Sequence, residues 1–223
     1  MKALHPIVIA IDGTSASGKS TTSKCIARKL GYVYVDTGAM YRTLAWYCLQ
    51  KHVDLHDDKT IGALCQKWNT KLECVQQDDA LRSVRLLVDG YYPEKEIRTS
   101  ETSVAVAFVA QVKKVREWMK KVQRECIRFG DLVMEGRDIG TNIFPETDYK
   151  FFLDAHLEER NKRRAAEGVN ENLAERDRRD SSRATSPLMV ALGAVTINNS
   201  GESIEATADR IIAEIDKRRP VKA

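Results

Sequence analysis

The chain has 223 residues, enough for one sizeable core or for one core with a smaller insert. A composition that is 43% hydrophobic and 30% charged excludes a mainly disordered chain. The net charge of +4 is small beside 36 basic and 32 acidic residues, so only local clusters of charge are informative. The sequence has no run of eighteen apolar residues, enters an apolar run almost directly, and spaces its five cysteines too widely for zinc or redox motifs. We therefore expect a cytoplasmic protein with reduced thiols and no membrane partner.

The first predicted unit is a strand, a glycine-rich loop and a helix. Residues 7–11 are apolar and mostly β-branched, as in a buried parallel strand, and Thr21 to Leu30 has a helical pattern. Between them, the stretch GTSASGKS from Gly13 to Ser20 matches the phosphate-binding pattern G-x-x-x-x-G-K-[ST]. Glycines let the backbone wrap an anion, the helix amino terminus supplies free N–H groups, Lys19 can reach the outer phosphates and Ser20 can ligate Mg²⁺. We therefore predict a P-loop, whose candidate nucleotide-binding residues are Gly13, Ser15, Ala16, Ser17, Gly18, Lys19, Ser20 and Thr21.

The second unit is another strand followed by a helix. The run at 32–35 predicts a buried strand, and the pattern at 39–51 predicts a helix with one core face. Thr37 and Arg42 come at the carboxyl end of that strand, where open α/β sheets bind their ligands. Both are therefore candidate substrate-binding residues.

From 52 to 98 the sequence becomes more polar. It contains a short predicted helix at 61–68, strand-like runs at 71–75 and 83–88, and an Asp89-Gly90 hairpin signal. Because short turns rather than helices join these strands, we predict a small mixed α+β insert within the single domain, not another βα layer.

The last third of the chain returns to the alternation of strands and helices. The predicted elements are, in order, helices at 100–109 and 112–129, strands at 132–134, 149–153 and 195–197, and a final helix from Ser203. The strand at 132–134 brings Arg137 and Asp138 to the same sheet edge as the P-loop. Together the units predict a three-layer α/β fold, with a five-stranded parallel sheet and helices on both faces.

An arginine-rich segment, residues 157–184, lies between the fourth and fifth predicted strands. Taken alone, its interleaved acids and bases are typical of a solvated helix with i, i+4 pairs. However, Arg176, Arg179, Asp180 and Arg183 share one helical face, and few apolar residues anchor the segment. Beside a P-loop, such a segment is typical of a mobile lid that closes over a transferring phosphate.

Other classes of P-loop protein are less consistent with the sequence. A regulatory GTPase should carry D-x-x-G and N-K-x-D motifs, and neither is present at a plausible strand end. A nucleic-acid ATPase should be larger or more basic, with aromatic residues among the basic ones, so we expect no nucleic-acid partner. A small-molecule kinase of the shikimate or gluconate type would not need the insert. A non-catalytic nucleotide-binding protein would be expected to lack Lys19 or the lid arginines. Both of these alternatives stay open at this point.

Five ordered segments resemble the bacterial cytidylate kinases, a family of P-loop nucleoside monophosphate kinases. They are Ile11-Asp12-Gly13 at the P-loop, DTGAMYR from Asp36, EGRDIGT from Glu135, FLDA from Phe152 with Glu159-Arg160 after it, and ERDRRD from Glu175. The resemblance covers nearly the whole chain. It implies the nucleoside monophosphate kinase fold, ATP as phosphoryl donor, Mg²⁺, and CMP or dCMP as acceptor, with the insert in the acceptor-binding region. On this basis we expect a monomeric enzyme of pyrimidine metabolism.

The resemblance also implies roles for individual residues. Those implied to contact the acceptor are Thr37, Arg42, Arg116, Arg137, Asp138, Arg176, Asp180 and Arg183. Those implied to act in catalysis are Lys19, Arg137, Arg163 and Arg183. Arg160 and Arg163 match the donor side of the lid, so Arg160 is a further ATP-binding candidate, and Ser20 matches the position that holds the metal.

Base choice has a physical basis in this assignment. The Asp138 carboxylate can accept a hydrogen bond from the exocyclic amine of cytosine, whereas it would oppose an oxygen of uracil.

The sequence departs from the family pattern at four places. Thr37 stands where serine is common, Glu135 where aspartate is expected, and Ala107 where a serine hydroxyl commonly meets the base. The connection from Arg164 to Arg176 is shorter than usual for the family.

Overall fold

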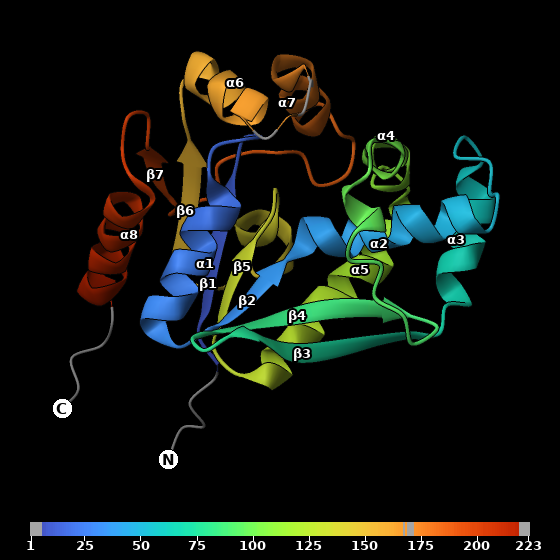
Figure 1. Ribbon diagram of the computed structural model, residues 1–223, viewed down its shortest axis with the longest axis horizontal. Coiled ribbons are helices and arrows are strands. Elements are labelled where there is room, and N and C mark those ends of the chain that lie inside the picture. Colours follow the sequence, from blue (N-terminus) through green and yellow to red (C-terminus); the bar gives the residue numbers. More distant parts are fainter. Residues whose placement is uncertain (1–5, 167, 169–171, 219–223) are drawn as a thin grey trace.

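A mostly parallel sheet forms the middle of the computed structural model, which describes residues 6–166, 168 and 172–218. The strand order across the sheet is β3-β4-β2-β5-β1-β6-β7 (Figure 1). All neighbouring pairs are parallel except β3 with β4. The strands are β1 (Val8–Gly13), β2 (Val33–Asp36), β3 (Thr70–Asp78), β4 (Leu81–Val88), β5 (Leu132–Glu135), β6 (Tyr149–Asp154) and β7 (Val195–Asn198).

The sheet has seven strands, so the prediction of five is wrong. The two strand-like runs of the insert are β3 and β4, and β4 pairs in parallel with β2 from Val33↔Arg82 to Val35↔Val84. The sequence predicts that a short turn joins the two runs, but not that they pair with the open edge of β2. The Asp89-Gly90 turn follows β4 and does not join the two strands; both of its residues have positive φ. Treating residues 52–98 as a separate subdomain stays a prediction.

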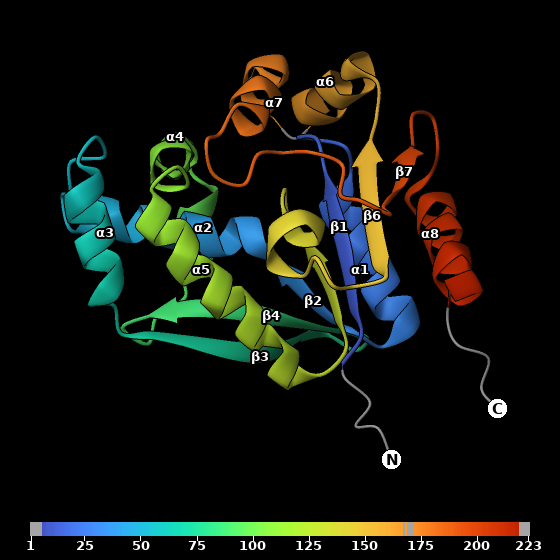
Figure 2. The same cartoon turned by 180° about the vertical axis from the view of Figure 1, so that it is seen from behind.

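Helices cover both faces of the sheet, as predicted. On one face lie α1 (Lys19–Leu30) and α8 (Ile204–Arg218), in front in Figure 1, where Ile26, Ile211 and Ile215 pack on the sheet. The other face, seen in Figure 2, carries α2 (Thr37–Gln50), α4 (Ser100–Val109) and α5 (Lys113–Glu125). Among the described residues, no helix is both long and apolar enough to cross a membrane. Further from the sheet centre, α3 (Asp58–Gln66) packs on α5.

The arginine-rich segment forms two helices above the carboxyl ends of β1 and β6 (Figures 1 and 2). These are α6 (Leu157–Ala166) and α7 (Leu173–Ser181); the residue before α7, Asn172, is its N-cap and accepts the Glu175 N–H with its side chain. Residues 167 and 169–171 of the predicted lid lie outside the described residues. The strand order places β1 between β5 and β6, so the P-loop, the segment after β5 and the two helices meet at one edge.

Candidate active site

The P-loop joins β1 to α1 through backbone conformations that favour glycine. Gly13 has a φ of 150° and Gly18 a φ of 85°. A Cβ at Gly13 would lie 1.9 Å from the carbonyl oxygen of Leu153, so only glycine lets β1 approach β6 there. The Lys19 ammonium is buried and donates to the carbonyl oxygen of Thr14 and, at 3.4 Å, to Ser17 Oγ. The loop therefore holds its own lysine against its backbone.

A buried carboxylate ends the strand β5, which lies between β1 and β2. Glu135, at the end of β5, accepts a 2.5 Å hydrogen bond from Tyr34 Oη and also lies beside the Ser20 hydroxyl. Burial raises the pKa of Glu135, and the nearby charge of Asp36 raises it further, while Lys19 lowers it. Glutamate therefore keeps a carboxylate here, where the family pattern leads us to expect aspartate.

Arg116 and Asp138 form a buried ion pair. Arg116 Nη2 donates to Asp138 Oδ2 at 2.7 Å, Nη1 donates to the carbonyl oxygen of Ala110, and the guanidinium lies over the Tyr41 ring. Asn142 Nδ2 also donates to Asp138 Oδ2, at 3.0 Å. Within the part of the chain that the structure describes, Asp138 Oδ1 has no hydrogen-bond donor and the buried Arg116 Nε has no acceptor. One acceptor and one donor thus remain available to a ligand.

A third buried carboxylate, Asp180 of α7, binds two arginines. Arg137 Nε donates to Asp180 Oδ2 at 2.9 Å, and Arg183 Nη2 donates to Oδ1. Burial alone would raise the pKa of Asp180, but the charges of Arg137, Arg183 and Arg176 hold it below its ordinary value. The ion pairs join α7 to the segment after β5. Arg137 and Arg183 thus come together on Asp180, and their contact with the acceptor stays a prediction.

On the donor side, α6 and α7 contact the P-loop directly. Arg160 is buried; its Nη1 donates to the carbonyl oxygen of Ser15 at 3.1 Å and to Asp177 Oδ2. Asp177 Oδ1 accepts the Ser15 N–H at 3.0 Å. Arg163 donates from both Nη atoms to Asn199, whose side-chain amide donates to the carbonyl oxygen of Ser17 at 2.9 Å. Both predicted donor-side arginines are therefore attached to the loop.

Four cations are linked electrostatically at this edge of the sheet: Lys19, Arg42, Arg137 and Arg176. Burial lowers the pKa of Lys19, and the charges of Arg137 and Arg176 lower it further. Burial likewise lowers the pKa of Arg42 to about 10, with Arg176, Arg98 and Arg137 acting in the same direction against Asp36. Arg137 and Arg176 are thus within electrostatic reach of both Lys19 and Arg42. Such a cluster of positive charge attracts groups that carry several negative charges.

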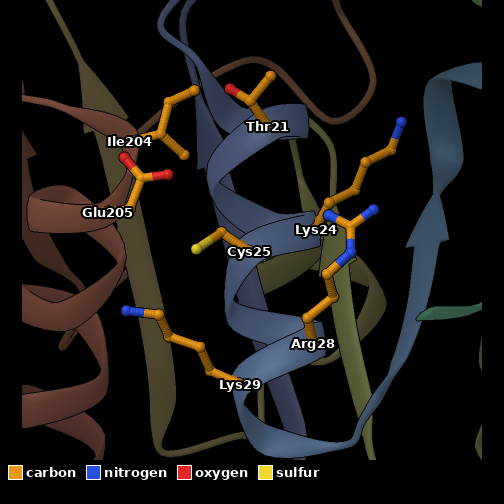
Figure 3. Close-up of a pocket in the computed structure, with 7 residues that line it drawn as sticks. All are labelled: Thr21, Lys24, Cys25, Arg28, Lys29, Ile204 and Glu205. Atoms are coloured by element: carbon orange, nitrogen blue, oxygen red, sulfur yellow. The ribbon is translucent and has the colours of Figure 1, made fainter. Parts of the chain in front are cut away.

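Two predicted residues have local partners instead. The Thr37 hydroxyl donates to the carbonyl oxygen of Glu135 at 2.7 Å, so its proton is not available to a substrate in this conformation. Thr21 Oγ1 donates to the carbonyl oxygen of Gly18, and Thr21 lines a hollow between α1 and α8 (Figure 3). Two of the three cations that line that hollow form ion pairs, Arg28 with Asp78 and Lys29 with Asp209, and the third, Lys24, lies over the Tyr34 ring.

Sequence reasoning missed three residues that organise the site. Asp12 accepts two backbone N–H groups after Asp138, Asp177 accepts the Ser15 N–H, and Asn199 links Arg163 to the loop. Asp12 and Asp177 stand inside the family segments quoted above, which was the available signal. Asn199 follows β7 and carried no signal in the sequence.

A P-loop that faces several arginines is typical of an enzyme that transfers phosphoryl groups. The sequence profile described as cytidylate kinase matches residues 9–217. The chain is 39% identical over 221 residues to the cytidylate kinase of Bacillus subtilis (strain 168), covering 94% of this chain and 96% of that protein. It is 41% identical to the cytidylate kinase of Geobacillus thermodenitrificans (strain NG80-2), covering 95% and 97%. The chain therefore belongs to the cytidylate kinase family and is a nucleoside monophosphate kinase.

Two further similarities agree with this assignment. The chain is 39% identical to a bifunctional pantoate ligase/cytidylate kinase of Trichormus variabilis, covering 95% of this chain and 41% of that longer protein. An uncharacterized protein from Eubacterium ventriosum ATCC 27560, known from its crystal structure, shares the fold with a TM-score of 0.52. Its identity is 14%, covering 95% of this chain and 99% of that one. This last similarity concerns the fold alone.

Proposed function

We propose that the chain transfers the γ-phosphoryl group of ATP to CMP or dCMP, giving ADP and CDP or dCDP, in a Mg²⁺-dependent reaction. Family membership supports the reaction and ATP as the donor. The convergence of Lys19, Arg42, Arg137 and Arg176 carries the proposal, because it is the place where donor and acceptor phosphates would meet. No observation favours a shikimate-type or a non-catalytic reading.

Phosphoryl transfer needs positioning and neutralisation of charge more than covalent help from the protein. The P-loop and Arg160 hold the donor phosphates, with Lys19 stabilising the charge that develops on the transferred group. Arg42 and Arg137 hold the acceptor phosphate, and Arg163 and Arg183 close the site from the lid. Helices α6 and α7 also exclude water, which would otherwise compete with the acceptor for the phosphoryl group.

The acceptor base is recognised by the ion pair of Arg116 and Asp138. Asp138 Oδ1, which has no donor among the described residues, accepts the exocyclic amine of cytosine. The Arg116 Nε, which has no acceptor among them, donates to an acceptor atom of the ring. Uracil presents an oxygen where cytosine has the amine, so it leaves Asp138 Oδ1 without a donor. Arg176 and Asp180 hold the sugar, and Ala107 offers the base no hydroxyl.

The residues present fit Mg²⁺ bound chiefly through phosphates. Mg²⁺ prefers oxygen ligands and usually takes one or two protein groups together with phosphates and waters. The Ser20 hydroxyl beside the Glu135 carboxylate supplies such oxygens. Among the described residues there is no cluster of three or more side chains able to hold a metal alone. The ion would neutralise phosphate charge during the transfer.

A steady-state acceptor panel tests the proposal. ADP release would be followed with ATP and Mg²⁺ and with CMP, dCMP, UMP, AMP or shikimate as acceptor, and mass measured by light scattering would check the proposed monomer. CMP and dCMP should give the highest kcat/KM. Asp138→Ala and Asp138→Asn should lose efficiency with CMP more than with UMP. Shikimate as the preferred acceptor, or no turnover of any nucleoside monophosphate, would refute the proposal.

A further inference from the structure

Asp12 is a buried carboxylate at the end of β1, directly before the first glycine of the P-loop. Asp12 is 3% exposed, and it accepts two hydrogen bonds from the segment that follows the neighbouring strand, β5. Its Oδ1 accepts the Ile139 N–H and its Oδ2 accepts the Gly140 N–H, both at 2.8 Å. Neither oxygen is bonded to the P-loop. The motif therefore does not explain why a carboxylate is buried here.

The two amides belong to the residues that immediately follow Asp138. There the chain enters a short π-helical turn, Ile139–Ile143, in which the carbonyl oxygen of Asp138 accepts the N–H groups of Asn142 and Ile143. The first N–H groups of a helical turn have no partner within the turn, and the Asp138 side chain does not cap them. Asp12 supplies both missing acceptors from the neighbouring strand.

This arrangement fixes Asp138 from two directions. Arg116 and Asn142 hold its side chain, while Asp12 holds the backbone that follows it. Because Asp12 adjoins Gly13, its two bonds set the position of Asp138 relative to the P-loop. A shift of 1 Å between a bound group and the reacting centre can cost a large part of the rate.

We infer that Asp12 is a positioning residue for base recognition: by binding the amides of Ile139 and Gly140 it keeps Asp138 in register with the P-loop. The cytosine is thereby read where its phosphate lies in line for transfer. This inference rests on the proposed reading of the base by Asp138. A purely electrostatic role for Asp12 is the alternative, because its charge also acts on Lys19. An electrostatic role would change the affinity for ATP.

Asp12→Asn is the sharpest perturbation. The amide keeps one oxygen for one N–H group but turns its own N–H₂ toward the other, so one buried donor loses its acceptor. Asp12→Ser is the second variant, because it keeps an acceptor in a smaller volume. The matched control is Asp131→Asn. Asp131 accepts the Ile7 N–H at 2.7 Å at the opposite, amino end of the same strand pair.

The assay measures kcat/KM for CMP and for UMP, together with KM for ATP. Asp12→Asn should lower kcat/KM for CMP about tenfold, narrow the CMP to UMP ratio and leave KM for ATP unchanged. Asp131→Asn should leave the ratio as in the wild type. In an Asp138→Asn background, Asp12→Asn should change the ratio no further, because both substitutions act on the same recognition step.

The outcomes are distinguishable. If Asp138→Asn alone keeps the wild-type ratio, the proposed base reading fails and the inference fails with it. If Asp138→Asn narrows the ratio but Asp12→Asn lowers CMP and UMP efficiency equally, or raises KM for ATP in parallel, only the inference is overturned. Failure of both Asp12 variants to fold would show a structural role and would overturn it as well.

Discussion

Asp138→Ala is expected to destabilise the protein by about 3 kcal/mol, because it leaves the Arg116 guanidinium buried without a counter-charge. The side chains of Arg116 and Asp138 are 3% and 8% exposed and lie 2.7 Å apart. Removing one partner of such a buried pair costs about 3–5 kcal/mol. Arg116 keeps its 3.1 Å hydrogen bond to the carbonyl oxygen of Ala110 and its place over the Tyr41 ring, so we expect the lower end of that range.

Urea unfolding and thermal unfolding measure this loss. The urea midpoint should fall with an unchanged slope, and Tm should fall by about 6–12 °C, given about 2–4 °C per kcal/mol for a chain of this size. Asp138→Asn also removes the charge but keeps an oxygen for Arg116, so it should cost about 1 kcal/mol less than Asp138→Ala. The double variant Arg116→Met, Asp138→Ala removes both charges, so it should be more stable than the sum of the single losses by about 2 kcal/mol. Strictly additive losses, or an Asp138→Ala variant as stable as the wild type, would refute the buried pair.

Three other predictions concern the phosphate side and the response to pH. Lys19→Ala should lower kcat by orders of magnitude and leave the urea midpoint nearly unchanged, since Lys19 acts on charge that develops in the transition state; near-normal turnover would exclude that role. Asp177→Asn should lower KM for ATP several-fold, because the carboxylate competes with phosphate for the Ser15 N–H. The control Glu175→Gln, on the same helix, should leave KM for ATP unchanged. A raised KM in Asp177→Asn would mean that Asp177 serves to hold the lid. Burial raises the pKa of Asp12 from 3.8 to about 6, with Asp138 raising it and Lys19 lowering it. The folded protein should therefore gain stability relative to Asp12→Asn as pH falls from about 6 to about 4, by up to roughly 3 kcal/mol, and equal pH profiles of unfolding would contradict this.

Much of the site could be predicted because its groups follow strands whose local pattern is strong. The P-loop, the ends of β2 and β5, and the arginines of α7 are each encoded within about ten residues, and parallel strands bring their carboxyl ends to one edge. The left-handed Gly31 that ends α1 was equally predictable, since its C-cap position needs a positive φ.

The remainder depends on partners that no local pattern encodes. Asp177 binds the Ser15 N–H 162 residues away, and Asp12 binds the Ile139 N–H 127 residues away. Backbone N–H groups carry no residue identity, so the sequence gives no sign of which of them a carboxylate will meet. The pairing of β4 with β2 is similar, because an open strand edge is a property of the assembled sheet.

The position of β5 between β1 and β2 imposes an order on how the protein assembles during synthesis. β1 and β2 are complete once Asp36 has been made, yet neither can pair with the other, because the strand that joins them ends only at Glu135. At about 5–20 residues of synthesis per second, the edges of β1 and β2 that later bind β5 stay unpaired for roughly 5–20 s. Nascent chains halted before Leu132 should therefore bind chaperones and aggregate when released, whereas chains extended past Asp154, which also complete β6, should resist proteolysis.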